Sequence, residues 1–262
     1  MKGLLEKMLV QLDQPVNYTL KLDSIVPMNA LIGQEIQLKW TQNIYCSGCG
    51  KKTKSSFGQG FCYPCFMESP LASPCIINPE LCRAHLGEGR DIAWEEQHHN
   101  KPHVVYLASS DCVKVGVTSA SNKFVRWIDQ GASQAIVLAE TENRYEAGLL
   151  EVALKSVLSD KTNWQRMLKN QVDLSIDLVE EKGRIEEILP TDLRKFVSSN
   201  DQVTLIDYPV LTYPTKITSL GFDKTPCVEG KLVGIKGQYL LFENQQVLNI
   251  RKHTGYEIEL SA

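Results

Sequence analysis

The stretch Cys46-Ser-Gly-Cys-Gly-Lys-Lys-Thr-Lys-Ser-Ser-Phe-Gly-Gln-Gly-Phe-Cys-Tyr-Pro-Cys65 contains two Cys-x-x-Cys pairs separated by twelve residues. Two residues between cysteines allow both sulfurs to reach one tetrahedral ion, and Gly50 can take the positive φ that such a turn needs. A thioredoxin-like redox pair and ordinary buried cysteines are the alternatives, and the polar, Gly- and Lys-rich context disfavours both. We expect a structural zinc ion (Zn²⁺) whose ligands are Cys46, Cys49, Cys62 and Cys65. Four protein ligands leave no open position for hydrolysis.

The composition indicates a globular protein that stays in the cytoplasm. The 262 residues are 43% hydrophobic and 23% charged, which suffices for a core in one or two domains. Residues 1–10 lack the apolar run of a signal peptide, and no stretch approaches the roughly 20 apolar residues of a membrane span. In that compartment the eight cysteines should be reduced, which favours metal binding. The net charge of -3 argues against a strong nonspecific nucleic-acid binder.

Three further soft ligands follow closely in the stretch Pro74-Cys-Ile-Ile-Asn-Pro-Glu-Leu-Cys-Arg-Ala-His85. Cys75, Cys82 and His85 are therefore candidates for a second zinc site. No fourth ligand is obvious from the spacing. The candidates for that position are His98, His99 and His103.

Both ends of the chain show the alternation of half-buried strands. Near the N-terminus this pattern covers 18–22 and 36–40. Near the C-terminus strands are expected at 203–206, 231–235, 239–242 and 247–250. The C-terminal strands fit a small sheet or barrel, which the N-terminal strands can complete because chain termini often lie close together.

The central region predicts the order strand, strand, helix, strand, helix. Two strands, 104–107 and 113–117, are joined by a polar turn. Helical spacing covers 123–130 and 144–158, and 135–139 between them has the character of a buried strand. The following segment, 171–201, is rich in Asp and Glu and is expected to be a solvated helix or connector.

Four polar or charged side chains in this region stand out by their order on the expected elements: Tyr106, Lys114, Arg126 and Glu151. With the motifs Val104-Val-Tyr106 and Lys114-Val-Gly116, they resemble the GIY-YIG nuclease superfamily over about sixty residues. The sequence departs from that pattern where Val-Val replaces Gly-Ile and where Lys114 replaces the second tyrosine. Singly, each of the four side chains is more often a core or surface residue.

The resemblance to GIY-YIG nucleases implies a role for each of these residues. Tyr106 would position or deprotonate water, and Lys114 would act as a base or contact phosphate. Arg126 would grip phosphate with two hydrogen bonds, and Glu151 would hold Mg²⁺ or Mn²⁺.

A wider resemblance covers nearly the whole chain. The stretches 52–60, 126–132, 161–164 and 234–240 are similar to an uncharacterised bacterial family, domain of unknown function 2797. Members of that family often carry a cysteine near the position that Gly89 occupies here. The resemblance places Arg144, Asn163 and Trp164 beside the candidate cleft. There Asn163 and Trp164 would contact a base or phosphate, and the alternative for the Trp164 indole is a role as a packing anchor.

The sequence therefore predicts an α+β protein. Its expected parts are an N-terminal β segment (1–45), a zinc-binding module (46–102), a GIY-YIG-like domain (103–170), an acidic connector (171–201) and a C-terminal β domain (202–262). Three functions remain open. They are a metal-dependent nuclease, a noncatalytic adaptor that binds DNA or RNA, and a protein-interaction scaffold. In the first two, nucleic acid would contact the basic stretch Lys51, Lys52 and Lys54; the adaptor would add Lys231, Lys236, Arg251 and Lys252.

Overall fold

The computed structural model describes residues 1–155, 157–158, 163–173 and 176–262, so Lys161 and Thr162 of the 161–164 motif lie outside the described residues. The chain forms two compact units. Unit 1 contains Met1–Glu68, Ile128–Gly131 and Ile206–Ala262, and unit 2 contains Ser69–Trp127 and Ala132–Leu205. The predicted zinc module 46–102 is thus divided between the units at Glu68.

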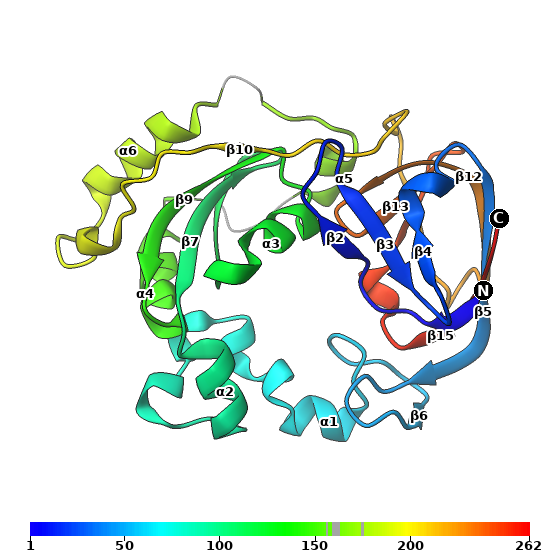
Figure 1. The fold of residues 1–262 in the computed structure, drawn as a ribbon, viewed down its shortest axis with the longest axis horizontal. Helices are drawn as coiled ribbons and strands as arrows, with labels where there is room; N and C mark the ends of the chain where they lie inside the picture. Colours follow the sequence, from blue (N-terminus) through cyan, green and yellow to red (C-terminus); the bar gives the residue numbers. More distant parts are fainter. Residues whose placement is uncertain (156, 159–162, 174–175) are drawn as a thin grey trace. The chain divides into compact units, whose positions relative to one another are not determined.

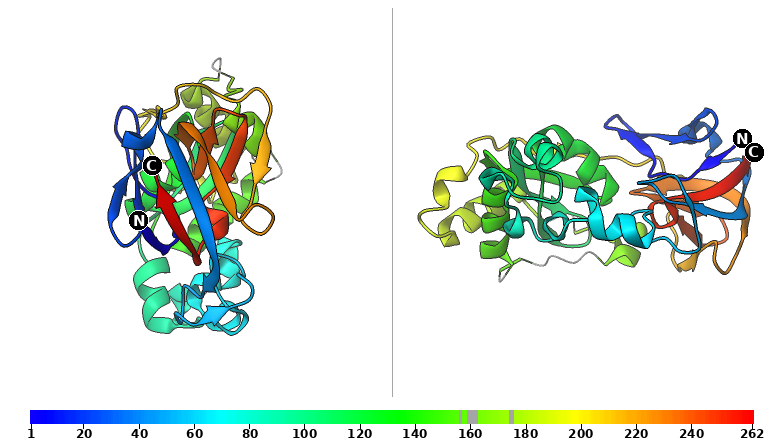
Figure 2. Two further views of the ribbon diagram at one scale, coloured as in Figure 1. Left: turned by 90° about the vertical axis from the view of Figure 1, so that its right-hand side faces the viewer. Right: turned by 90° about the horizontal axis from the view of Figure 1, so that it is seen from below.

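Unit 1 is built on one mixed sheet that joins both ends of the chain. Its strands follow the order β1 (Lys2–Leu4), β15 (Tyr256–Ser261), β5 (Glu35–Tyr45), β12 (Cys227–Lys236), β13 (Tyr239–Phe242), β14 (Gln246–Asn249) and β11 (Thr218–Leu220). The first and last strands pair antiparallel, with Lys2 opposite Glu259, so the termini lie side by side (Figure 2). A three-stranded sheet, β2 (Leu9–Gln11), β3 (Asn17–Lys21) and β4 (Ile25–Pro27), completes the unit's strands except for β6.

Alternating side chains of these strands form the core of unit 1. In β5, Ile36 and Leu38 are buried while Glu35 and Lys39 are exposed, as a half-buried strand requires. Strand β12 is buried continuously over its last residues, including Ile235. Of the strands expected at the two ends of the chain, 36–40, 231–235, 239–242 and 247–250 therefore belong to one sheet. The expected strand 18–22 lies in the three-stranded sheet, and 203–206 belongs to the sheet of unit 2.

Unit 2 contains an antiparallel sheet in the order β10 (Thr204–Leu205), β9 (Gln134–Thr141), β7 (His103–Ser109) and β8 (Val113–Ser119). Strand β7 lies between β8 and β9 and is fully buried, which explains its unbroken apolar run. Helix α3 (Lys123–Asp129) connects β8 to β9, and α4 (Arg144–Leu154) follows β9.

The two faces of this sheet are covered by different helices (Figure 1). On one face, Leu150 and Leu154 of α4 pack into a cluster with Val105 and Leu107. On the other face, Tyr106 meets Trp127 of α3 edge to face, with ring centroids 5.9 Å apart. Successive residues of a strand point to opposite faces, so β7 separates the two layers.

The acidic segment is more than a solvated connector. Its helix α6 (Leu178–Ile188) buries Leu178 and Ile185, which join the cluster formed by α4 and the sheet. Lys182 of the same helix is also buried and pairs with Asp201 at 2.8 Å. The acidic segment therefore also contains apolar side chains that pack into the core of unit 2.

The remaining elements are short. They are β6 (Lys52–Thr53), α1 (Tyr63–Glu68), α2 (Ile92–His99), α5 (Trp164–Leu168) and the 3-10 helices η1 (Met28–Leu31), η2 (Pro70–Ala72), η3 (Pro74–Ile76), η4 (Pro79–Leu81), η5 (Ala84–Leu86), η6 (Ala120–Asn122), η7 (Arg194–Phe196) and η8 (Arg251–His253). Within the described residues, no helix combines the length and the apolar character that crossing a bilayer requires.

Candidate metal centres and a charged cluster on the central sheet

The two Cys-x-x-Cys pairs meet in unit 1. The sulfur atoms of Cys46, Cys49, Cys62 and Cys65 all lie within 4.8 Å of one another. Thiolates around a tetrahedral zinc ion, each about 2.3 Å from the metal, are separated by a little under 4 Å. The Cys49 and Cys62 sulfurs are 3.9 Å apart. The four-cysteine group can therefore hold a metal ion such as zinc.

Backbone amides stabilise a thiolate in this group. The N–H groups of Gly48 and Cys62 donate to the Cys46 sulfur over 3.3 and 3.1 Å. Burial opposes ionisation of this thiol, but the backbone N–H groups outweigh it and lower the pKa of Cys46 to about 6. A sulfur held as thiolate near neutral pH is the form that binds metal.

Two glycine-containing turns bring the pairs together. The first turn joins β5 to β6, whose register places Tyr45 opposite Lys52, and Gly50 within it has φ 70°. In the second, Gly60 has φ 98°, and a Cβ there would collide with the Ser47 hydroxyl. The amide of Ser47 donates to the Gly60 carbonyl at 2.8 Å, which ties one turn to the other.

A second group of soft ligands lies in unit 2. It consists of Cys75, Cys82 and His99, whose ligand atoms also lie within 4.8 Å of one another. All three side chains are buried. The structure thus brings the two predicted cysteines together but places His99 beside them where the first choice from spacing was His85. The His85 ring instead stacks on Tyr145 with centroids 4.5 Å apart.

Tyr106 and Gly116, from the two motifs of the predicted hairpin, face each other across β7 and β8. A Cβ on Gly116 would lie 2.5 Å from the Tyr106 hydroxyl oxygen, so only glycine leaves room for the ring. Tyr106 is fully buried. The glycine of Lys114-Val-Gly116 is therefore explained by its packing against the Tyr106 ring.

Arg126 lies within electrostatic range of both Lys114 and Glu151. Burial lowers the pKa of Lys114 to about 8, against the attraction of Asp111, and the positive charge of Arg126 lowers it further. Burial also raises the pKa of Glu151, while the charges of Arg144 and Arg126 lower it. Arg126 is thus near both the buried amine and the half-buried carboxyl.

Two carboxylates near these groups have no signal in the sequence. Glu80 raises the pKa of Glu151 by charge repulsion. One Glu80 carboxylate oxygen lies 3.9 Å from Lys155, and the other is buried with no hydrogen-bond partner among the described residues. Asp111 is buried and accepts a hydrogen bond from the Asn163 amide at 3.3 Å. Glu80 reaches the cluster through tertiary packing, because it lies far from Glu151 in sequence, whereas Asp111 lies three residues before Lys114 in the same hairpin.

The residues expected to contact nucleic acid have different surroundings. The basic side chains on the four-cysteine turns, Lys51, Lys52 and Lys54, are exposed. Arg144 is half-buried and donates to the carbonyls of Cys75 and Ile76, both at 3.0 Å. Asn163 caps α5 by accepting from the amides of Gln165 and Arg166, and Trp164 is the half-buried first residue of that helix. Arg144 and Asn163 thus have structural partners.

The additional cations of the adaptor hypothesis do not form one surface. Lys236 is fully buried, with its amine 5.1 Å from the Tyr208 ring and 5.4 Å from the Tyr213 ring. Burial lowers the pKa of Lys236 to about 8. Lys231 pairs with Glu243 at 3.4 Å, while Lys252 is exposed and Arg251 half-exposed. The prediction that Lys236 contacts phosphate is therefore wrong.

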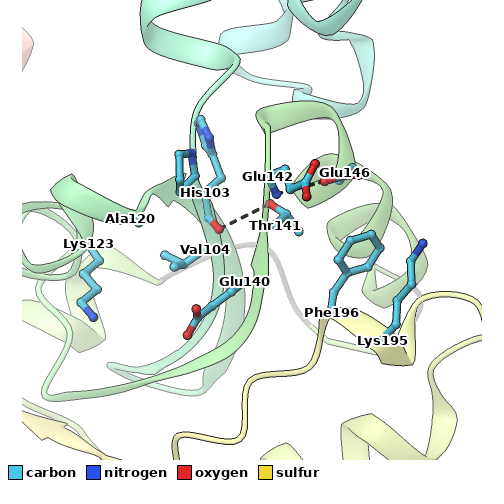
Figure 3. A pocket seen from close by; sticks show the side chains of 11 residues that line it. His103, Val104, Ala120, Lys123, Glu140, Thr141, Glu142, Glu146, Lys195 and Phe196 are labelled. Carbon is cyan, nitrogen blue, oxygen red and sulfur yellow. Dashed lines mark hydrogen bonds between the residues drawn. The ribbon is translucent and has the colours of Figure 1, made fainter.

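A pocket of about 710 Å³ lies at the end of the unit 2 sheet where β7 begins and β9 ends (Figure 3). Its lining includes His103, Lys123, Glu140, Glu146 and Phe196, and none of the four predicted catalytic residues. Glu146 accepts a hydrogen bond from the Glu142 amide at 3.0 Å, which stabilises the N-terminal end of α4. The pocket and the charged cluster are distinct features of unit 2.

Comparison with known proteins gives one family. The model of the family described as "Protein of unknown function (DUF2797)" matches residues 33–258. No curated protein and no solved structure matches the chain. The matched range includes both cysteine groups and the whole β7–β9 sheet. The chain belongs to the DUF2797 family.

Proposed function

We propose that this protein processes nucleic acids by metal-dependent hydrolysis of phosphodiester bonds, and that its four-cysteine zinc centre serves as a structural support. The element order of unit 2 supports the proposal. Strands β7 and β8 form a hairpin, α3 and β9 follow, and α4 comes last, in the order on which the resemblance to GIY-YIG nucleases rests. Fold alone does not decide activity, so the charged cluster carries the argument.

The single observation that carries the proposal is that the charge of Arg126 acts on both the buried amine of Lys114 and the half-buried carboxyl of Glu151. A buried amine with a pKa of about 8 and a carboxyl with a raised pKa are costly for stability. Such perturbed groups concentrate at functional sites, where a depressed lysine pKa yields a base near neutral pH. Together these groups offer a base, a phosphate-binding guanidinium and a cation ligand.

A divalent cation fits beside Glu151. The buried oxygen of Glu80 without a described partner is a hard donor of the kind that Mg²⁺ prefers. When bound by Glu151 and Glu80, the cation would neutralise charge on the phosphate and the leaving oxygen. Arg126 then orients the phosphate, and Lys114 accepts a proton from the attacking water. Tyr106, which is fully buried, acts in this scheme by positioning the cluster.

The test uses the full chain with Mg²⁺ or Mn²⁺ on a panel of single-stranded, double-stranded and branched DNA and RNA. We expect cleavage of at least one substrate, and its loss in Glu151→Gln with the fold unchanged. Glu186→Gln on the exposed face of α6 is the matched control and should cut normally. Absence of cleavage across the panel, or equal cleavage by Glu151→Gln, would refute hydrolysis.

A second candidate, noncatalytic binding of DNA or RNA, is favoured by one observation. Lys51, Lys52 and Lys54 are exposed, and no acidic residue occurs within residues 46–66. Binding through these side chains releases counterions, so affinity should fall steeply with salt. Salt-dependent binding without cleavage would select this function. Capture of a protein partner that survives nuclease treatment, without nucleic-acid binding, would instead select the scaffold.

A further inference from the structure

A buried carboxylate that the sequence does not point to lies beside the second group of soft ligands in unit 2. Glu95 lies one helical turn before His99 on α2, and both side chains are buried. We propose that Cys75, Cys82, His99 and Glu95 bind a second zinc ion. This inference is independent of any nuclease activity.

Interatomic distances support coordination. The Cys75 sulfur lies 3.8 Å from Nδ1 of His99, and a Glu95 carboxylate oxygen lies 3.7 Å from the same nitrogen. A nitrogen–oxygen hydrogen bond is about 2.7–3.2 Å long, so the His99–Glu95 separation is too long for one. Ligands about 2.0–2.3 Å from a tetrahedral zinc ion are roughly 3.3–3.8 Å apart. The His99 nitrogen is thus spaced from both neighbours as one ligand is from another.

The burial of the Glu95 carboxyl group provides the second argument. An ionised carboxylate away from water is strongly destabilising unless a cation balances it. The ion pairs of the described residues place only His99 opposite Glu95, and the Arg90 amide donates to the carboxylate at 3.0 Å. One neutral imidazole nitrogen cannot serve both Cys75 and Glu95. A divalent cation would satisfy the nitrogen, the sulfur and the carboxylate together.

Gly89 provides the space that the carboxylate occupies. A Cβ at Gly89 would lie 2.5 Å from the carboxyl carbon of Glu95 and closer still to one oxygen. The absence of a side chain at position 89 lets Glu95 turn inward beside His99. The position of the carboxylate is thus determined by close packing on one side and by the Arg90 amide on another.

The segment around these residues has only a small apolar cluster of its own among the described residues. Its local cluster contains only Cys75, Cys82 and Ala84, with Tyr145 packed against it. The larger apolar side chains of the segment are exposed, and they are Ile77, Leu81, Leu86 and Ile92. The backbone forms short 3-10 helices, which bury too few residues to stabilise themselves. Metal binding supplies folding free energy in such segments.

The proposed centre is attached to the helix that carries Glu151. Arg144 of α4 donates to the carbonyls of Cys75 and Ile76, and Gly148 allows the η4 backbone to approach the helix closely. Glu80, the neighbour of Glu151, belongs to this η4 turn. A zinc ion at the second centre would therefore hold Glu80 in place beside Glu151.

His85 is the competing fourth ligand, because its Nδ1 is buried without a hydrogen-bond partner among the described residues. Its ring stacks on Tyr145, however, whereas a Glu95 carboxylate oxygen lies 3.7 Å from Nδ1 of His99. The two alternatives make opposite predictions for single substitutions. We assign Glu95 as the ligand.

The first experiment measures zinc content of the full chain by inductively coupled plasma mass spectrometry. We expect about two zinc ions per chain in the natural protein and, after challenge with a chelator, about one in Glu95→Gln. Glu96→Gln, an exposed neighbour on α2, and His85→Ala should keep two. Retention of both ions by Glu95→Gln together with loss of one by His85→Ala would overturn the assignment of Glu95.

The second experiment needs no variant and so does not depend on folding of a mutant. Zinc-edge X-ray absorption of the natural protein should give an average of about three sulfur ligands and about one nitrogen or oxygen ligand per zinc. One zinc ion per chain with four sulfur ligands would mean that only the four-cysteine group binds, and would overturn the second centre. Neither measurement involves catalysis, so failure of the proposed hydrolysis leaves both readouts interpretable.

Discussion

Replacing Gly148 by alanine should destabilise unit 2, although the same change in an ordinary helix stabilises. Gly148 lies inside α4 against the η4 turn. A Cβ there would lie 2.5 Å from the Pro79 carbonyl carbon and 2.7 Å from the Glu80 Cα, and closer still to the Glu80 amide nitrogen. These are backbone atoms, which cannot rotate away as a flexible side chain does. The turn must shift as a unit or separate from the helix.

The magnitude follows from two opposing effects. Alanine gains about 0.5–1 kcal/mol over glycine in a helix interior. Overpacking in a close-packed region costs about 1–3 kcal/mol. We therefore expect Gly148→Ala to lower the free energy of unfolding by about 1–2 kcal/mol, with a weaker zinc affinity of the second centre because Cys82 directly follows η4.

Gly183→Ala is the matched control. Gly183 lies in the middle of α6, is exposed, and a Cβ there would meet nothing within 4 Å. This variant should gain about 0.5–1 kcal/mol. Urea unfolding followed by tryptophan fluorescence is a suitable assay, because Trp94, Trp127 and Trp164 all belong to unit 2. Equal stabilisation by both substitutions would refute the close contact between α4 and η4.

Three further predictions concern other parts of the molecule. Burial holds the pKa of His103 at about 4 against about 6.5 when unfolded, so between these pH values only the unfolded chain binds the proton. Stability should fall by on the order of 2–3 kcal/mol as pH drops from 6.5 to 4, and the loss should shrink in His103→Gln in pH-dependent urea titrations. Gly60→Ala should lower the free energy of unfolding by about 1–3 kcal/mol, because φ is 98° and the added Cβ would meet the Ser47 hydroxyl. The same change should weaken zinc binding by the four-cysteine group in chelator competition, and wild-type affinity would contradict this. If nucleic acid binds at the exposed basic turns, joint replacement of Lys51, Lys52 and Lys54 by alanine should reduce the slope of log affinity against log salt by up to about 3, and an unchanged slope would exclude that surface.

Local spacing in the sequence was sufficient for features that depend on neighbouring residues. Two residues between cysteines and a glycine beside them specify a metal-binding turn wherever it occurs, because ligand reach and backbone conformation are local properties. Alternation likewise located β3 and β5, since the side chains of a strand alternate whatever its partner is. The α+β class followed from these patterns.

Identification of the four-cysteine group was therefore possible from sequence, whereas the second group was identified only in part. Cys75 and Cys82 are close in the chain, but the choice between His85 and His99 depends on how α2 packs against the 3-10 turns. Glu95 had no signal, because a glutamate on a short polar helix is ordinarily exposed. Its burial is a consequence of the space at Gly89.

The tertiary structure alone decided which charges are available for chemistry and which are used for packing. Lys236 ends strand β12, and lysines at the ends of strands are often exposed. Here the strand is enclosed, and the Lys236 amine lies over two tyrosine rings. Arg144 is engaged with backbone carbonyls, while Glu80 reaches Glu151 only because η4 packs on α4. Residue type and periodicity are local, but burial and charge environment depend on elements that are distant in the chain. For that reason the sequence could specify the cysteine-bearing turns and most strands, and only packing could determine which side chains surround each candidate site.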